Sequence, residues 1–223
     1  MSDAAPNLTR PVLIAATVTL VVSVLRLVGE LQGWSAALFG VHEPGTAPQP
    51  GMLGIWVLVP IFGFWFGRRL RQRTGGPPHA GKAALWFAIG IAVVAGGFAA
   101  LVTSGLVPFG TEEAPEVAAG LQYILIVDAI AAAVLVFAWP RLAGVLALYG
   151  VLARIPVVAI TWLALENGWH THHVLLPPGI VLPEGTSQFA FLATPQLTVW
   201  ILFTMGIGGL AGCLGAATAG RRG

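Results

Sequence analysis

Long apolar segments recur six times along this chain and leave little sequence between them. An α-helix needs about 20 apolar residues to cross a bilayer core roughly 30 Å thick. A helix is suited to this environment because all of its backbone hydrogen bonds form within the segment. The six segments are residues 11–34, 52–67, 83–108, 119–139, 141–166 and 195–219. Charged residues make up only 9% of the 223, against roughly 25% in soluble domains. The sequence therefore predicts an all-α polytopic membrane protein, a single domain (residues 1–223) with six transmembrane helices.

The basic residues predict how these helices are oriented, because Lys and Arg are enriched on the cytoplasmic side of a membrane. Outside the predicted spans they lie before the first segment, in every second loop and at the end of the chain, whereas the predicted outer loops 35–51, 109–118 and 167–194 contain Glu but neither Lys nor Arg. This pattern predicts three in–out hairpins with both termini in the cytoplasm. Abundant Arg, Ala and Gly beside a single Lys indicate a bacterial chain, so we expect the bacterial cytoplasmic membrane.

A cluster of four arginines follows the second segment: Arg68, Arg69, Arg71 and Arg73. Its simpler interpretation is a topology determinant that keeps this loop in the cytoplasm. The alternative is a site for anionic lipid headgroups, which attract basic residues close to the membrane surface.

Four ionisable residues fall inside the predicted spans, namely Arg26, Glu30, Asp128 and Arg154. At about 1.5 Å per helical residue, Arg154 lies roughly 20 Å from the inner boundary and Asp128 about 14 Å from the outer one. The two therefore share a depth on the arms of the hairpin that turns at Pro140, which predicts an Asp128–Arg154 ion pair. Arg26 lies within one turn of this depth, and Glu30 is its i+4 neighbour on the same helix face.

This neutral set of charges has three interpretations. A polar cavity lined by two guanidinium groups would hold an anionic or carboxylate-bearing solute, since Arg binds such oxygens with two parallel hydrogen bonds. Asp128 would alternatively carry a proton. The structural interpretation is a set of interhelical contacts that fix packing. The glycine-rich end of the last segment, from Gly206 to Gly212, favours close helix packing over a pore.

Histidines form a second cluster on the predicted outer side: His42, His170, His172 and His173. The spacing of the last three allows two imidazoles to reach one ion, so a zinc or copper site is a hypothesis here. The alternative is an interfacial loop whose His and Trp side chains lie among lipid headgroups.

Other functional signatures are missing from the sequence. Cys213 is the only cysteine, which excludes an intrachain disulfide and cysteine-based zinc or iron–sulfur sites. There is no G-x-S-x-G, H-E-x-x-H or Walker motif, and the basic loop lacks the aromatic residues expected of a nucleic-acid surface.

We therefore expect the lipid bilayer to be the main partner, with further copies or other membrane subunits as additional candidates. The leading functional hypothesis is a non-enzymatic protein for passage of a small solute or ion through the polar centre. The alternatives are a metal-binding protein or metal-dependent enzyme with the outer histidine site, and a structural or assembly subunit of a membrane complex.

Overall fold

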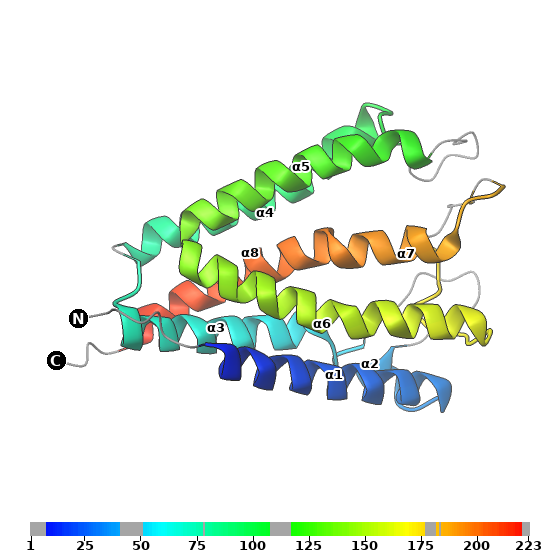
Figure 1. Cartoon of the computed structure of the whole chain (residues 1–223), viewed down its shortest axis with the longest axis horizontal. Helices are drawn as coiled ribbons and strands as arrows, with labels where there is room; N and C mark the ends of the chain where they lie inside the picture. Colours follow the sequence, from blue (N-terminus) through cyan, green and yellow to red (C-terminus); the bar gives the residue numbers. More distant parts are fainter. Residues whose placement is uncertain are drawn as a thin grey trace.

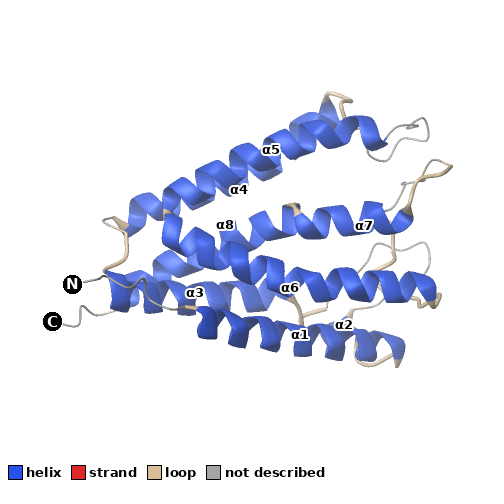
Figure 2. Cartoon of the chain, in the orientation of Figure 1, coloured by secondary structure: helices blue, strands red, loops and turns tan. Residues whose placement is uncertain are grey.

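The computed structural model describes residues 8–40, 51–77, 79–107, 117–176, 182 and 184–219. In these ranges all regular secondary structure is helical (Figure 2). The helices are α1 (Thr9–Leu31), α2 (Ala36–Phe39), α3 (Ile55–Thr74), α4 (Ala80–Thr103), α5 (Val117–Ala138), α6 (Pro140–Glu166), α7 (Gln188–Leu197) and α8 (Val199–Thr218). The predicted all-α class is therefore confirmed for the described residues.

Four of these helical segments are long and apolar enough to cross a membrane: α1, α4, α6, and α7 together with α8. A shorter apolar segment, Gln122–Ala138, belongs to α5. α3 has 20 residues, but its C-terminal half carries four arginines and is correspondingly polar. The long apolar helices suit a membrane-embedded protein.

The helix boundaries differ most from the sequence expectation at the end of α3 and at the start of α7. α3 continues past residue 67 to Thr74, because arginine favours the helical conformation although its side chain is charged. It ends where Gly75 takes a left-handed conformation (φ 86°), which glycine adopts without steric cost. The last helical segment begins at Gln188 instead of residue 195, capped by the Ser187 hydroxyl, which accepts a hydrogen bond from the Ala190 N–H.

The hairpin between α5 and α6 turns where the sequence predicts. Trp139 is extended (φ −160°, ψ 89°), and Pro140 is the first residue of α6. At this position a backbone N–H would have no partner within the helix, so the N–H that proline lacks costs no hydrogen bond. From this turn α5 and α6 diverge, and α5 runs beside α4 (Figure 1).

α3 and α8 form the most extensive helix pair. A Cβ built on Gly63 would lie 2.3 Å from the Gly208 carbonyl oxygen, and one on Gly67 would lie 2.0 Å from that of Gly212. Two small-x-x-x-small motifs thus face each other, an arrangement that lets helix backbones approach closely in membranes. The predicted packing role of the glycines in the last helix is confirmed, whereas the matching motif in α3 was not foreseen.

α1 is held against α6 by a buried polar contact. The Tyr149 and Thr19 hydroxyls are 2.8 Å apart, and Thr19 also donates to the Ala15 carbonyl. Since that bond uses the hydroxyl hydrogen of Thr19, Tyr149 is the donor between the two. Tyr149 also packs edge-on against Phe62 and Phe66 of α3.

The bundle has two distinct ends (Figure 1). The first turn of α1, the Arg-rich end of α3 and the last turn of α8 lie together at one end. The C-terminal end of α6 and the start of α7 lie at the other, where the α4–α5 hairpin stands apart from α6 and α7.

Candidate functional site

A cavity of about 930 Å³ lies in the half of the bundle remote from the first turn of α1. Side chains from α1, α3, α4, α5, α6, α7 and α8 contribute to its lining, together with the loop after α6. Its polar and charged residues are Thr19, Ser23, Arg26, Asp128, Arg154, His172, His173, Thr186, Ser187, Thr194, Gln196 and Thr198. Three of the four charges predicted inside the membrane and two of the histidines predicted on the outer side therefore face one space.

Arg154 lies on α6 and is only 7% exposed. Its Nη1 donates to the Gln196 Oε1 at 2.9 Å, and its guanidinium carbon lies 5.1 Å from the centroid of the Trp200 ring. The buried Nε has no hydrogen-bond partner among the described residues. A buried cation therefore lines the cavity with part of its hydrogen-bonding capacity unused.

Asp128 lies on α5 and is 8% exposed. Its Oδ2 finds no hydrogen-bond partner in the described part of the chain, although the carboxyl interacts with the Thr198 side chain.

The predicted Asp128–Arg154 ion pair is wrong. Among the described residues the ion pair is that of Glu30 with Arg26, and Glu30 also contacts the His172 imidazole. The prediction relied on equal depth, but depth does not fix the direction of a side chain around its helix. Because α5 and α6 diverge from the turn at Pro140, Asp128 and Arg154 line the same cavity without meeting.

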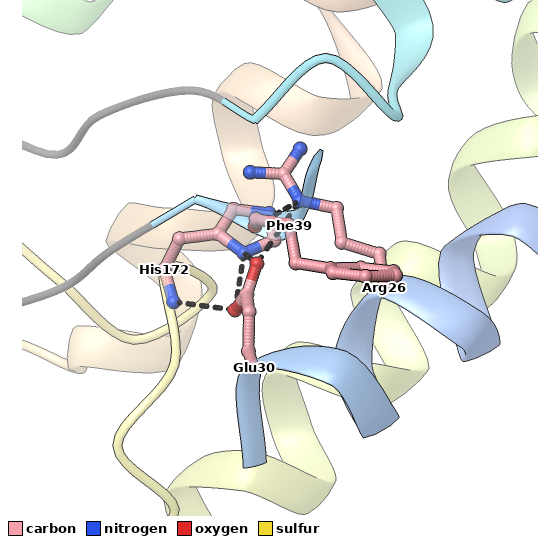
Figure 3. Close-up of polar contacts among 4 residues, drawn as sticks. All are labelled: Arg26, Glu30, Phe39 and His172. Atoms are coloured by element: carbon pink, nitrogen blue, oxygen red, sulfur yellow. Dashed lines mark hydrogen bonds and ion pairs between the residues drawn. The ribbon is translucent and has the colours of Figure 1, made fainter. Parts of the chain in front are cut away.

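Glu30 connects α1 to the loop after α6 (Figure 3). Its side chain is 3% exposed, and its carboxylate accepts from the Arg26 Nε at 3.0 Å, as the i+4 spacing predicts. It also accepts from the backbone N–H of His172 at 3.2 Å and from the His172 Nδ1 at 2.8 Å. The Arg26 Nε also donates to the Phe39 carbonyl at 3.3 Å. The charge of Arg26 is thus compensated locally.

Local backbone geometry brings His172 to this position. Gly168 has a φ of 64°, which reverses the chain after α6, and the Trp169 N–H donates back to the Ala164 carbonyl at 2.9 Å. Arg26 finds room beside Gly54, where a Cβ would lie 3.2 Å from its Nη1. These small residues therefore place the imidazole and the guanidinium on either side of the Glu30 carboxylate.

Burial lowers the pKa of His172, and its contacts with the Glu30 carboxylate offset this only in part. The neutral imidazole is therefore favoured. Since Nδ1 faces both oxygens of a carboxylate, the proton of the neutral ring lies on Nδ1 and is donated to Glu30.

The four predicted metal-binding histidines have different surroundings. The rings of His172 and His173 lie 3.8 Å apart between centroids and both line the cavity, whereas His170 is exposed. His42 lies outside the described residues. Within the described ranges no group of three or more His, Cys, Asp or Glu side chains is arranged to hold a metal ion, so a zinc or copper site that includes His42 stays a prediction.

The arginine cluster lies on the last turns of α3, at the opposite end of the bundle. Arg68 donates to the carbonyl and hydroxyl oxygens of Thr218, Arg69 stacks over Trp65 at 5.0 Å, and Arg71 hydrogen-bonds the Gly75 carbonyl. Three members thus make contacts within the chain, and headgroup binding, with Arg73 as the fourth residue, stays a prediction.

Sequence reasoning missed several cavity residues. Gln196 and Thr198 are polar residues next to Pro195 in an otherwise apolar segment, which is a usable signal. Trp200 follows one turn after Gln196, but nothing in the sequence indicates that its ring contacts the Arg154 guanidinium.

Comparison with protein-family models, with curated proteins and with solved structures gave no match, so the functional assignment rests on the geometry of this cavity.

Proposed function

We propose that this protein crosses the cytoplasmic membrane of a bacterium six times, as three in–out hairpins with both termini in the cytoplasm. α3 and α5 provide the two spans beyond the four long apolar ones. Large apolar side chains exposed on the outside of the bundle support a lipid-facing surface; they include Leu13, Val21, Ile126, Phe137 and Ile155. The Arg-rich end of α3 then faces the cytoplasm, and the cavity lies in the outer half of the membrane.

In this cavity, we propose, the protein binds a small anionic solute and passes it across the membrane. The observation that carries the proposal is a space of about 930 Å³ that reaches Arg154, a buried cation with no ion-pair partner among the described residues. A charge at this depth costs several kcal/mol unless it is compensated or faces a polar space. A bound anion supplies that compensation.

The geometry around Arg154 suits such a ligand. Gln196 holds one terminal nitrogen, and Trp200 supports the guanidinium from its ring face. A guanidinium fixed in this way is preorganised to donate to the oxygens of a carboxylate or sulfonate. Arg26 adds positive potential at the cavity wall, although Glu30 offsets most of it.

The purely structural interpretation finds less support. Interhelical contacts that only fix packing are expected to pair charges across helices and to leave little space between them. Here Asp128 and Arg154 remain apart, and each has a buried polar atom without a hydrogen-bond partner in the described ranges.

Efflux from proteoliposomes tests the proposal. Vesicles are loaded with benzenesulfonate, which stays anionic near neutral pH and crosses bilayers slowly. We expect the wild-type protein to accelerate release and Arg154→Gln to return it to the rate of protein-free vesicles. Arg141→Gln is the matched control, because Arg141 is an exposed arginine on the same helix. Wild-type release no faster than from protein-free vesicles would favour a structural or assembly subunit instead, and equal acceleration by the wild type and Arg154→Gln would refute the role of Arg154.

A further inference from the structure

One wall of the cavity is apolar apart from Asp128 of α5. It is formed by one face of the α4–α5 hairpin, with Val94, Ala95 and Phe98 from α4 and Ile124 and Val127 from α5. This wall and the polar residues around Arg154 belong to one continuous space. The cavity therefore combines a buried cation with a largely apolar wall.

The volume exceeds what a small hydrophilic anion needs. About 930 Å³ lies at the upper end of the range of about 300–1,000 Å³ typical of pockets for drug-sized ligands. An ion the size of acetate would leave the apolar wall facing water, whereas a ligand with a hydrocarbon body would displace that water favourably.

We propose that the ligand is an amphipathic monoanion, with its acidic group on Arg154 and a hydrocarbon body against the α4–α5 hairpin. This inference rests on the proposed function and names the class of solute. Two independent features support it: the buried guanidinium, whose Nε is still available as a donor, and the apolar wall. Medium-chain carboxylates have this chemistry.

The hydrocarbon body should contribute to the binding affinity in proportion to its length. Burial of each methylene group tightens binding about fourfold, which corresponds to about 0.8 kcal/mol. Six additional methylenes separate decanoate from butanoate. Even with partial burial, decanoate is expected to bind at least about a hundredfold more tightly.

Equilibrium dialysis provides the test. Labelled decanoate, butanoate and decanol are dialysed at pH 8 against the full-length protein in phosphatidylcholine nanodiscs, with protein-free nanodiscs subtracted. We expect decanoate to bind far more tightly than butanoate, and Arg154→Gln to weaken decanoate at least tenfold while leaving decanol unchanged. Arg154→Lys, which keeps the charge, should retain more affinity, and Arg141→Gln should behave as the wild type.

A second variant tests the apolar wall separately. Ala95→Phe fills part of the cavity and should weaken decanoate but not butanoate. Ala92→Phe is the matched control, because Ala92 is exposed one turn earlier on α4 and does not line the cavity. This pair does not alter the charged residues, so it remains informative if the Arg154 variants do not fold.

The outcomes separate the two proposals. If butanoate binds as tightly as decanoate and both depend on Arg154, the amphipathic ligand is wrong and the anion site stands. If folded Arg154→Gln binds decanoate like the wild type, both proposals are wrong. A parallel series with phosphatidylglycerol distinguishes the source of the anion: competition with decanoate indicates a membrane lipid, and undiminished decanoate binding indicates a ligand taken from water.

Discussion

Substitution of Gly67 by alanine tests the closest helix contact in the bundle. The added Cβ would lie 2.0 Å from the carbonyl oxygen of Gly212 and 2.5 Å from its Cα, whereas ordinary contacts begin at 3.4 Å. The obstacle is backbone, which cannot move aside as a flexible side chain can. α3 and α8 must therefore separate by about 1.4 Å at this point, the difference between the 3.4 Å and 2.0 Å distances.

Such a separation weakens dispersion contacts along the whole interface, because a gap of 0.5–1 Å already removes about a quarter to a half of the attractive energy of each contact. We expect a loss near the upper end of the usual overpacking range, about 3 kcal/mol. For a chain of this size that corresponds to a fall in Tm of about 6–12 °C.

Thermal stability in dodecylmaltoside, measured by size-exclusion chromatography after heating, checks this value. Gly144→Ala is the matched control, because Gly144 also lies within a helix and a Cβ there meets nothing within 4 Å. It should leave the Tm unchanged or raise it slightly, since alanine favours helix. Equal melting of Gly67→Ala and the wild type would show that α3 and α8 do not pack as described.

Three further predictions concern the polar contacts. Tyr149→Phe removes the hydrogen bond to Thr19 and should cost about 1 kcal/mol, seen as a Tm lower by about 2–4 °C; no loss would contradict the α1–α6 contact. Because folding lowers the pKa of His172 below 6.5, the unfolded chain binds the proton more readily, so stability should fall as the pH drops below about 6.5. His172→Gln should reduce this dependence in Tm measurements from pH 8 to 5, unlike the exposed His170→Gln, and an unchanged dependence would refute it. An anion bound at Arg154 adds a negative charge to the cavity that Asp128 lines, so we expect uptake of about one proton per ligand, abolished in Asp128→Asn. Titration calorimetry in buffers of different ionisation enthalpy measures the uptake, and binding without proton uptake by the wild type would contradict it.

The helices were largely predictable because their signal is local. Long apolar runs and the turn at Pro140 locate most of them. The start of α7 was misplaced although most residues after Ser187 are apolar. The end of α3 was misplaced because its last helical residues are polar, at the arginines before Gly75. A hydropathy pattern reports burial in lipid, and it underestimates helices that continue beyond the apolar region.

The site was predictable only where it depends on one helix. The Arg26–Glu30 contact follows from i+4 spacing, which any helix imposes. The His172–Glu30 contact joins residues 142 positions apart and depends on how the chain reverses after α6. The Asp128–Arg154 error has the same origin, since equal depth on two helices does not give the rotation of either one.

The position of a bound anion decides whether Arg154 holds an anionic ligand in the cavity. Crystals of the protein soaked with 4-bromobenzenesulfonate would reveal the bromine by its anomalous scattering. We expect bromine density against the α4–α5 wall, with the sulfonate oxygens within hydrogen-bond distance of the Arg154 guanidinium. Bromine confined to the arginines at the end of α3, with none in the cavity, would contradict this expectation.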